Sequence, residues 1–326
     1  MEQAISYENR IKLDELNHSV YKIRAEVAKV IVGQEQPFDL MLTALLANGH
    51  ILIEGVPGVA KTMMAKLLAK TINTGFSRIQ FTPDLMPSDV LGTTVFNNSK
   101  ATFEFNQGPI FSNIVLIDEI NRAPAKTQSA LFEVMEERQV TTDGVTRAME
   151  NPFMVIATQN PVEHEGTYRL PEAQLDRFLF KIEIDYPNLE KEIQIIKNAS
   201  ERLVHKETDL VATAVEAQEI INYQSIIKQV VMDENLMRYI AMIVHKTRNN
   251  HALYLGASPR ASLAILNASK AFAAIEGRDF VSPDDIKTVV QPILAHRVML
   301  TPEKEMEGIK PALIIKQIVD GIEIPR

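Results

Sequence analysis

The sequence predicts an α/β fold in which a mostly parallel, five-stranded sheet precedes a second, all-helical domain. Five short apolar runs have the composition of strands, and helical segments stand between several of them. This alternation is typical of parallel sheets, whose strands are covered by helices on both faces and are therefore apolar almost throughout. Strand-like runs stop near residue 187, and long amphipathic segments follow. We therefore expect two domains, residues 1–187 and 188–326.

The spacing of apolar residues predicts the elements of the first domain. Helical spacing indicates two lead-in helices, over residues 11–31 and 36–47, the second ending at Asn48 and Gly49. The strand-like runs are residues 51–54, 76–82, 114–118, 153–159 and 178–185. Further helices are expected over residues 62–72 and 127–137. Residues 83–107 lack a clean crossover helix, so they are interpreted as an insert between the second and third strands.

Two β-hairpins are predicted to project from this sheet. The first lies within the insert and turns at residues 97–100, between two β-like runs. The second spans residues 139–147, because Asp143 and Gly144 favour a type I′ turn between alternating residues. We expect neither hairpin to extend the core of the sheet.

Amphipathic segments predict the helices of the second domain. They cover residues 189–199, 215–230, 233–248, 259–275 and 283–295, with a last helix over 308–319. Ser258 and Ser282 each precede a proline, which is a typical helix start with an N-cap serine. The chain shows no internal repeat and no low-complexity stretch.

Composition and charge exclude several classes of protein. The 326 residues are 46% hydrophobic, which suffices for one large or two ordinary domains with real cores. Because cysteine is absent, disulfides and thiolate metal sites are excluded, and an intracellular compartment is expected. Neither a signal peptide nor a run of about 18 uncharged apolar residues is found, so we expect a cytoplasmic protein without a membrane span. The net charge of -8 provides no basic field, which disfavours nucleic acid as a partner.

The stretch EGVPGVAKT at residues 54–62 almost matches the phosphate-binding pattern G-x-x-x-x-G-K-[ST]. It stands between an apolar strand and a helix, where backbone N–H groups converge at a helix N-terminus and favour an anion. Lys61 is expected to neutralise the β- and γ-phosphates, and the Thr62 hydroxyl to ligate Mg²⁺. Ala60 replaces the last glycine of the pattern; we expect it to be tolerated if the residue is already helical, where alanine is preferred. The expected cradle comprises Gly55, Val56, Pro57, Gly58, Val59, Ala60, Lys61, Thr62 and Met63.

A pair of carboxylates ends the third strand-like run. Asp118 and Glu119 follow four apolar residues, and a parallel sheet presents this end of its strands to ligands. Asp118 is expected to hold Mg²⁺ through water, and Glu119 to orient and deprotonate the attacking water. An ordinary strand can also end in polar residues, but the preceding phosphate loop favours a nucleotide site.

Three further polar residues have two interpretations each. Asn160, after the fourth strand, could hold the lytic water or contact the γ-phosphate, or simply form a turn with Pro161. Arg177, before the fifth strand, could be a surface ion-pair partner or a charge delivered to a neighbour's phosphates. Arg260 is a cation at a helix start, which opposes the helix dipole and indicates a phosphate partner unless the side chain points outward.

With these residues identified, the chain resembles AAA+ ATPases of the MoxR family over nearly its whole length. The family-like stretches are IVGQ at 31–34, EGVPGVAKT at 54–62, GPIFSNIVLIDEINRAPAKTQSALFEVMEE at 108–137, ATQNP at 157–161, LPEAQLDRF at 170–178 and GASPRASLAIL at 256–266. Members of this family usually carry alanine before the lysine of the phosphate loop, so Ala60 agrees with the family. The resemblance implies a P-loop AAA+ core followed by an α-helical lid domain.

The resemblance also implies a role for each matching position. Lys61 and Thr62 fall on Walker A, Asp118 and Glu119 on Walker B, Asn160 on sensor 1, Arg177 on the arginine finger and Arg260 on sensor 2. Val32, Gly33 and Gln34 match the segment beside the adenine base. Residues 83–107 match the helix-2 insert, and residues 139–150 the hairpin before sensor 1. Related families reposition the lid, so the resemblance leaves open whether Arg260 acts on its own subunit's nucleotide or on a neighbour's.

The function implied by the resemblance is an ATPase that uses ATP and Mg²⁺ in a ring of identical subunits, expected to be a hexamer. Its implied role is chaperone-like remodelling or maturation of protein complexes, with a protein client and a von Willebrand factor A domain protein as partners.

Two alternatives stay open at this point. One is a motor stimulated by nucleic acid, because helicases carry the same inserts, although the net charge and the lack of a separate DNA-binding domain oppose it. The other is a scaffold that binds ATP without hydrolysing it, which the intact Lys61, Asp118, Glu119 and Asn160 oppose. A GTPase is disfavoured because the guanine-reading motif Asn-Lys-x-Asp is absent.

Overall fold

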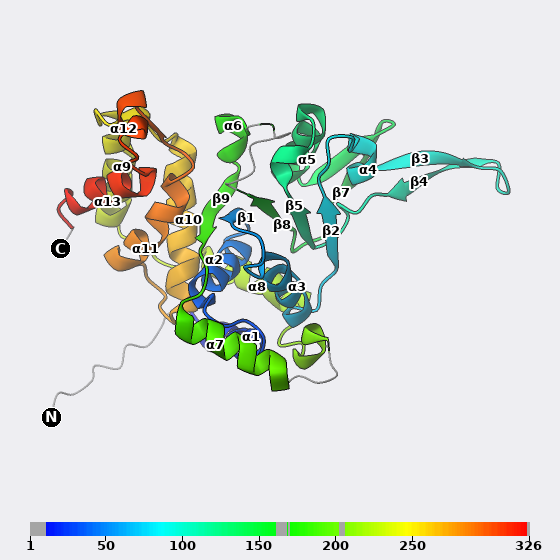
Figure 1. The fold of residues 1–326 in the computed structure, drawn as a ribbon, viewed down its shortest axis with the longest axis horizontal. Coiled ribbons are helices and arrows are strands. Elements are labelled where there is room, and N and C mark those ends of the chain that lie inside the picture. Colours follow the sequence, from blue (N-terminus) through cyan, green and yellow to red (C-terminus); the bar gives the residue numbers. More distant parts are fainter. Residues whose placement is uncertain (1–10, 161–167, 169, 202–205, 325–326) are drawn as a thin grey trace. The chain divides into compact units, whose positions relative to one another are not determined.

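Five parallel strands form the central sheet of the computed structural model, which describes residues 11–160, 168, 170–201 and 206–324 (Figure 1). The strands are β1 (His50–Gly55), β2 (Phe76–Gln80), β5 (Ile114–Asp118), β8 (Met154–Gln159) and β9 (Phe178–Ile184), in the order β2-β5-β8-β1-β9. Every neighbouring pair is parallel, so the carboxyl ends of all the strands lie at one edge. We call this the carboxyl edge and the opposite one the amino edge. The predicted five-stranded parallel sheet is confirmed.

Helices cover this sheet much as their apolar spacing predicts. The longer ones are α2 (Glu35–Leu46), α3 (Lys61–Thr71), α5 (Ala125–Glu137) and α7 (Leu189–Glu201). Helix α2 packs against β1 and β9, and α3 packs against β5. Before residue 222, four short elements of the described residues were not predicted, because three to five residues are too few to show a period: α4 (Pro87–Leu91), η1 (Ile120–Arg122), α6 (Glu172–Leu175) and η2 (Glu207–Leu210).

The chain divides into two compact units. The sheet unit comprises the described part of residues 23–221, and the helical unit comprises the described residues before 23 and from 222 onward. Helices α1 (Asp14–Ala28) and α8 (Ala217–Ile227) each run across a division. The segment after residue 187 belongs with the sheet because its backbone is bonded there: Ala214 and Val215 both donate to the Thr71 carbonyl. The two compact units are therefore divided after residues 22 and 221, and not at residue 187, where the strand-like runs end.

The helical unit contains more than helices. Its helices are α9 (Glu234–Arg248), α10 (Pro259–Ile275), α11 (Pro283–Leu294), α12 (Pro302–Met306) and α13 (Pro311–Asp320). Two short antiparallel strands, β10 (Leu253–Leu255) and β11 (Met299–Leu300), correct the expectation of an all-helical domain. They are too short for alternation to be seen in the sequence. The helix starts at Pro259 and Pro283 are confirmed, and Ser282 caps α11 through the Asp285 N–H. No described helix has both the length and the apolar character needed to cross a bilayer.

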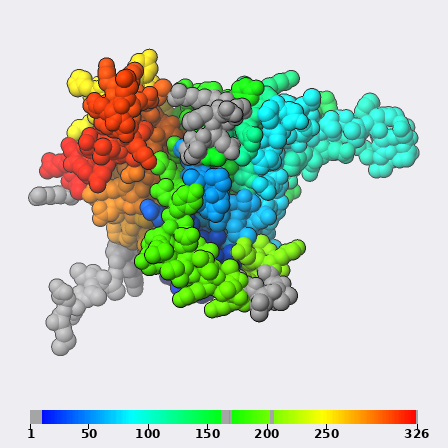
Figure 2. Space-filling model, viewed as in Figure 1, coloured from blue at the N-terminus to red at the C-terminus, as the bar shows by residue number. Residues whose placement is uncertain are grey.

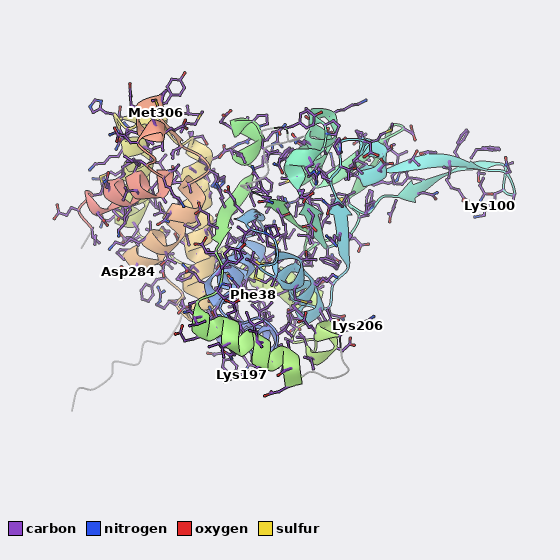
Figure 3. The ribbon with its side chains drawn as sticks, viewed as in Figure 1. Phe38, Lys100, Lys197, Lys206, Asp284 and Met306 are labelled. Carbon is purple, nitrogen blue, oxygen red and sulfur yellow. The ribbon has the colours of Figure 1, made fainter. Side chains whose placement is uncertain are left out.

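Both predicted hairpins are present in the sheet unit. Strands β3 (Gly92–Asn97) and β4 (Thr102–Gln107) form the longer one, which extends away from the sheet in Figures 1 and 2 and has Lys100 near its tip (Figure 3). Strands β6 (Gln139–Thr142) and β7 (Val145–Ala148) form the other. Its turn has φ values of 55° at Asp143 and 75° at Gly144, as a type I′ turn requires.

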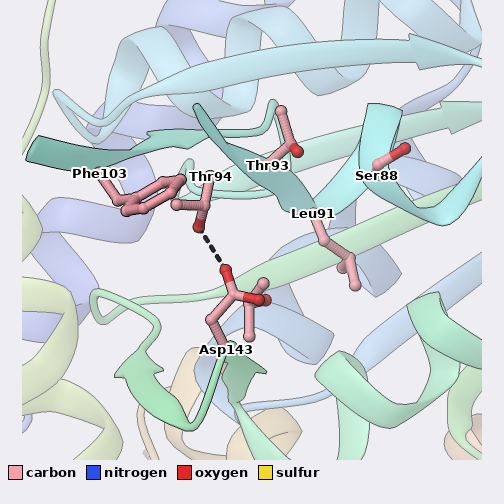
Figure 4. A pocket seen from close by; sticks show the side chains of 8 residues that line it. Ser88, Leu91, Thr93, Thr94, Phe103 and Asp143 are labelled. Carbon is pink, nitrogen blue, oxygen red and sulfur yellow. Dashed lines mark hydrogen bonds between the residues drawn. The ribbon is translucent and has the colours of Figure 1, made fainter. Parts of the chain in front are cut away.

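The two hairpins are fastened to each other. Thr94 on β3 donates a hydrogen bond to the Asp143 carboxylate in the turn of the second hairpin (Figure 4). Arg147 on β7 stacks over the Phe105 ring on β4, with 3.9 Å from its guanidinium carbon to the ring centre. Between the hairpins lies a pocket of about 670 Å³, lined by Ser88, Leu91, Gly92, Thr93, Thr94, Phe103, Thr142 and Asp143. The hairpins therefore form one projecting structure.

Candidate nucleotide-binding site

The phosphate-binding loop connects β1 to α3 at the carboxyl edge. Lys61 is the first residue of α3, and its Nζ donates to the Gly55 carbonyl at 2.6 Å, across the loop. A Cβ on Gly55 would lie 2.7 Å from the Ile184 carbonyl of β9, so the pairing of β1 with β9 leaves no room for a side chain there. Gly58 has φ 86°, and a Cβ there would meet nothing within 4 Å. Glycine is thus needed at 55 for space and at 58 for conformation.

Ala60 is in the left-handed conformation, with φ 60° and ψ 20°, at the N-cap of α3. The expectation that Ala60 is already helical is therefore wrong, and its high helix propensity does not explain it. The loop turns here before the first helical residue, and this turn requires the backbone that glycine adopts freely. In an alanine, this conformation costs about 1–2 kcal/mol. Residue 60 therefore has the left-handed backbone conformation that suits the glycine of the pattern, and the alanine side chain makes this conformation strained.

Asp118 ends β5 with both carboxylate oxygens engaged. Its Oδ2 accepts from Arg78 Nε at 2.6 Å, and its Oδ1 accepts from the Thr158 hydroxyl at 3.1 Å. The side chain is only 10% exposed, whereas that of Arg78 is 50% exposed. Arg78 and Thr158 come from β2 and β8, the strands on either side of β5. The sheet itself therefore fixes the position of this carboxylate.

Glu119 turns out of the strand in a left-handed conformation, with φ 58°. Its N–H donates to Thr158 Oγ1 at 3.1 Å, which fixes the turn. Its Oε2 accepts from Gln80 at 2.7 Å and from Arg122 at 2.9 Å. A non-glycine residue in this conformation is uncommon and often marks a functional site. Thr158 thus bonds both neighbouring acidic residues, one through its side chain and the other through its backbone.

The segment matched to the adenine side lies at the same edge. Gln34 is buried, and its side-chain amide donates to the Asp185 carbonyl at 3.2 Å, just beyond β9. Gly33 has φ 78°, and a Cβ there would come within 3.3 Å of Lys191 in α7. Because Ile184 of β9 pairs with Gly55 of β1, this segment and the phosphate loop share one end of the sheet. Residues 32–34 therefore lie at the end of the sheet that carries the loop before α3.

The oxygen ligands at this edge fit a magnesium ion carried with a nucleotide. Among the described residues, no cluster of three or more His, Cys, Asp or Glu could hold a metal. Mg²⁺ ordinarily uses one or two protein oxygens, with water and substrate phosphates completing its octahedron. Asp118 and the Thr62 hydroxyl could supply such oxygens, and both lie at the carboxyl edge because Thr62 follows the loop after β1 and Asp118 ends β5.

The structure separates the remaining predicted site residues. Asn160 follows β8 at the carboxyl edge and is half-buried. Arg177 precedes β9 and therefore lies at the amino edge, where it donates to the Phe132 carbonyl at 2.8 Å and pairs with Glu136 at 3.1 Å. Arg260 is the second residue of α10, in the helical unit. Lys61, Thr62, Asp118, Glu119 and Asn160 thus meet at one edge, and Arg177 does not.

A buried histidine anchors the amino edge. His50 opens β1; its Nδ1 accepts from the Val155 N–H at 2.9 Å, so Nε2 carries the proton and donates to the Met135 carbonyl at 3.0 Å. Burial, aided by the charge of Arg138, lowers the pKa of His50 from 6.5 to about 3. The ring is therefore neutral, and it ties β1, β8 and α5 together.

Sequence reasoning missed Arg78 and Gln80, which hold the two acidic residues. A signal was present in FSRIQ, where polar residues alternate with the buried Ile79. Alternation places Arg78 and Gln80 on one face of a strand. It does not reveal that β2 pairs with β5, which is what brings both side chains to Asp118 and Glu119.

Comparisons with known proteins agree with this geometry. The model of the ATPase family associated with various cellular activities (AAA) matches residues 50–180, and that of an AAA lid domain matches residues 245–318. The uncharacterised protein YeaC of Bacillus subtilis is 46% identical over 96% of this chain and 97% of its own. Chaperone MoxR1 of Mycobacterium tuberculosis is 42% identical over 95% of this chain and 83% of its own.

A solved structure extends the likeness to three dimensions. It is that of a protein of Cytophaga hutchinsonii provisionally assigned as an ATPase, 42% identical to this chain, with a TM-score of 0.90 over 97% of both chains.

Proposed function

Because the chain belongs to the MoxR family of AAA+ ATPases, we propose that it binds Mg-ATP at the carboxyl edge and hydrolyses it between the subunits of a ring. The observation that carries this proposal is the meeting of Lys61, Asp118 and Glu119 at one end of the sheet. A phosphate loop, a metal-binding carboxylate and a candidate base are the minimum set for phosphoryl transfer to water.

Each residue at this edge has a task in the proposed reaction. Lys61 leaves the Gly55 carbonyl to neutralise the β- and γ-phosphates, and the backbone of residues 55–60 cradles them. Thr62 and Asp118 hold Mg²⁺, which supplies charge neutralisation to the phosphates when bound. Glu119 orients the attacking water and takes its proton, and Asn160 positions that water or contacts the γ-phosphate. Val32, Gly33 and Gln34 border the adenine base.

The proposed ring follows from Arg177. Its guanidinium lies at the amino edge and is bonded to α5, so within one chain it is at the end of the sheet opposite to the phosphate loop. An arginine that stabilises the transferring phosphoryl group then has to come from a neighbour. Such head-to-tail contacts between identical subunits close into rings. We propose a hexamer, with Arg260 completing the site in cis or in trans.

The projecting hairpins are proposed to act on a protein client. They are fastened to each other by the bond of Thr94 to Asp143 and the stacking of Arg147 on Phe105, so they can move as one body. One relative, MoxR1, is named a chaperone. We propose chaperone-like remodelling or maturation of protein complexes, together with a von Willebrand factor A domain partner, in the cytoplasm.

Subunit mixing tests the shared site. Lys61→Ala removes the phosphate contact and Arg177→Ala removes the finger, so each variant alone should lose phosphate release by at least about 100-fold. A mixture should recover activity, because some interfaces then combine an intact Lys61 with an intact Arg177. A mixture that stays inactive, or an Arg177→Ala variant that turns over normally, contradicts the shared site.

Glu119→Gln tests the chemistry and provides a trap for the client. It should bind ATP as the wild type does and lose turnover by roughly 100-fold or more, because the general base is gone. In ATP, the trapped protein should retain its client and the von Willebrand factor A partner in a pull-down. Wild-type protein that binds ATP without releasing phosphate would favour a scaffold, and stimulation of turnover by single-stranded DNA would favour a nucleic-acid motor.

A further inference from the structure

Arg78 is hydrogen-bonded to Asp118, the carboxylate proposed to hold the metal ion. Its Nε lies 2.6 Å from Asp118 Oδ2, and it belongs to β2, an edge strand of the sheet. We propose that Arg78 is a built-in counter-ion that competes with Mg²⁺ for Asp118, and thereby sets the metal affinity of the site. The inference rests on the proposed function, because it assumes that Asp118 is the metal-binding carboxylate.

The register of the sheet shows how the arginine reaches this position. Arg78 pairs with Leu116 on β5, and Gln80 pairs with Asp118. The long side chain of Arg78 therefore extends along the strand by two residues to meet the carboxylate. Arginine spans this distance, and its planar guanidinium matches a carboxylate. The contact depends on a long cationic side chain at this register position.

Burial makes the contact stronger than an ordinary surface ion pair. Asp118 is only 10% exposed, and its other oxygen already accepts from Thr158. A carboxylate shielded in this way interacts more strongly with a nearby charge than an exposed one does. A guanidinium in direct contact with Asp118 repels a divalent cation that binds to the same carboxylate, directly or through water, so the two cations bind at each other's expense.

The Arg78 side chain can also move away from Asp118 when a metal ion binds. Its side chain is half exposed, and it starts from an edge strand, so the guanidinium can rotate into solvent without movement of the backbone. Glu119 also pairs with a partly exposed arginine, Arg122, but it is not the carboxylate proposed to hold the metal. Arg78 is therefore the exchangeable cation that controls the metal affinity of Asp118.

Arg122 offers a matched control. Its Nη1 lies 2.9 Å from Glu119 Oε2, and its side chain is 40% exposed, against 50% for Arg78. Replacing either arginine by glutamine removes one positive charge close to the acidic pair. Only Arg78→Gln removes it from the carboxylate that holds the metal.

The test measures metal binding and not turnover. Mn²⁺ is titrated into the full chain with a non-hydrolysable ATP analogue, and free Mn²⁺ is followed by electron paramagnetic resonance. Arg78→Gln should bind Mn²⁺ roughly tenfold more tightly than the wild type, within the range of coupling between neighbouring ligands. Arg122→Gln should change the affinity less than about twofold, and Arg78→Lys, which keeps the charge, should stay near the wild type.

Thermal unfolding provides a second reading of the same competition. Without metal, Arg78→Gln should melt lower than the wild type because Asp118 has lost its counter-ion, and Mn²⁺ should raise its Tm by more, in line with tighter binding. Wild-type affinity in Arg78→Gln, or equal gains in both glutamine variants, overturns the competition. Failure of all four proteins to bind Mn²⁺ with nucleotide would instead overturn the assignment of the site.

Discussion

The two edges of the same sheet are built in opposite ways. At the carboxyl edge, Ala60 and Glu119 hold left-handed backbone conformations, and the ionic contacts of Asp118 and Glu119 involve arginines that are 40–50% exposed. At the amino edge, His50 is buried, and both of its ring nitrogens are hydrogen-bonded to backbone groups. The ion-pair partners at the carboxyl edge can be exchanged for a ligand, whereas the backbone partners of His50 at the amino edge cannot.

This difference separates stability from activity within one element. Strained residues and exchangeable ion pairs are expected where a ligand has to enter and displace existing contacts. Buried hydrogen bonds to backbone groups are expected where strands have to stay fixed, because a lost partner leaves an unsatisfied polar group. Loss of the buried hydrogen bonds of His50 should therefore mainly lower the free energy of unfolding, and loss of the ion pairs of Asp118 and Glu119 should mainly alter nucleotide and metal chemistry.

Acid should act first on the amino edge, with the largest effect. His50 has a pKa of about 3 in the folded chain, against 6.5 when unfolded. As the pH falls below 6.5, the unfolded state takes up a proton that the folded state does not, so stability is lost progressively from there down to about 3. Between pH 7 and 4.5 the loss is about 2–3 kcal/mol, at about 1.4 kcal/mol per pKa unit.

His50→Gln isolates this contribution, because glutamine can hydrogen-bond but does not titrate in this range. Urea unfolding of both proteins at pH 7 and pH 4.5 measures the four free energies. The wild type should lose about 2–3 kcal/mol more than the variant on acidification. Parallel losses in the two proteins would show that His50 is not what makes the amino edge acid-sensitive.

Thr158→Val should affect both stability and turnover. The hydroxyl bonds the Asp118 carboxylate and the Glu119 N–H, and valine keeps the shape but neither bond. The unsatisfied N–H and the weakened carboxylate should lower the free energy of unfolding by about 1–2 kcal/mol. Turnover should fall further than this loss explains, since the position of Glu119 depends on the same hydroxyl. Thr158→Ser should restore both stability and turnover. Unchanged phosphate release in Thr158→Val would show that the hydroxyl is only structural.

Ala60→Gly should have the smallest effect, and it should be stabilising. Glycine relieves about 1–2 kcal/mol of left-handed strain, and the greater freedom of the unfolded chain removes about 0.4–1 kcal/mol of that gain. The net increase in unfolding free energy should be about 0.5–1 kcal/mol by urea denaturation, with ATP affinity close to that of the wild type. A large gain in affinity would show instead that the native loop is compromised by its alanine.

Sequence patterns predicted well those elements whose conformation is set by residues close together in the chain. Apolar runs located the strands, because a strand covered on both faces excludes water along its whole length. Proline after serine located the starts of α10 and α11, and Asp143-Gly144 located a type I′ turn. Strands β10 and β11 were missed because they have only three and two residues, too few to show alternation.

The conformation of Ala60 was predicted wrongly for a different reason. A propensity describes a residue in isolation, and it favours alanine in a right-handed helix. The position of the turn between β1 and α3 imposes φ 60° instead. The chain accepts the strain because the neighbouring elements are already fixed by their own packing.

By itself, the sequence determined the order of strands and helices, the phosphate loop, and the acidic pair after β5. Each of these is a matter of residue type at short spacing, which the chain carries locally. Only the tertiary structure decided that β2 pairs with β5, which brings Arg78 to Asp118 and Gln80 to Glu119. It also placed Arg177 at the amino edge, away from the acidic pair. Contacts between residues about 40 positions apart depend on strand order and register, and these are set by how the whole sheet packs.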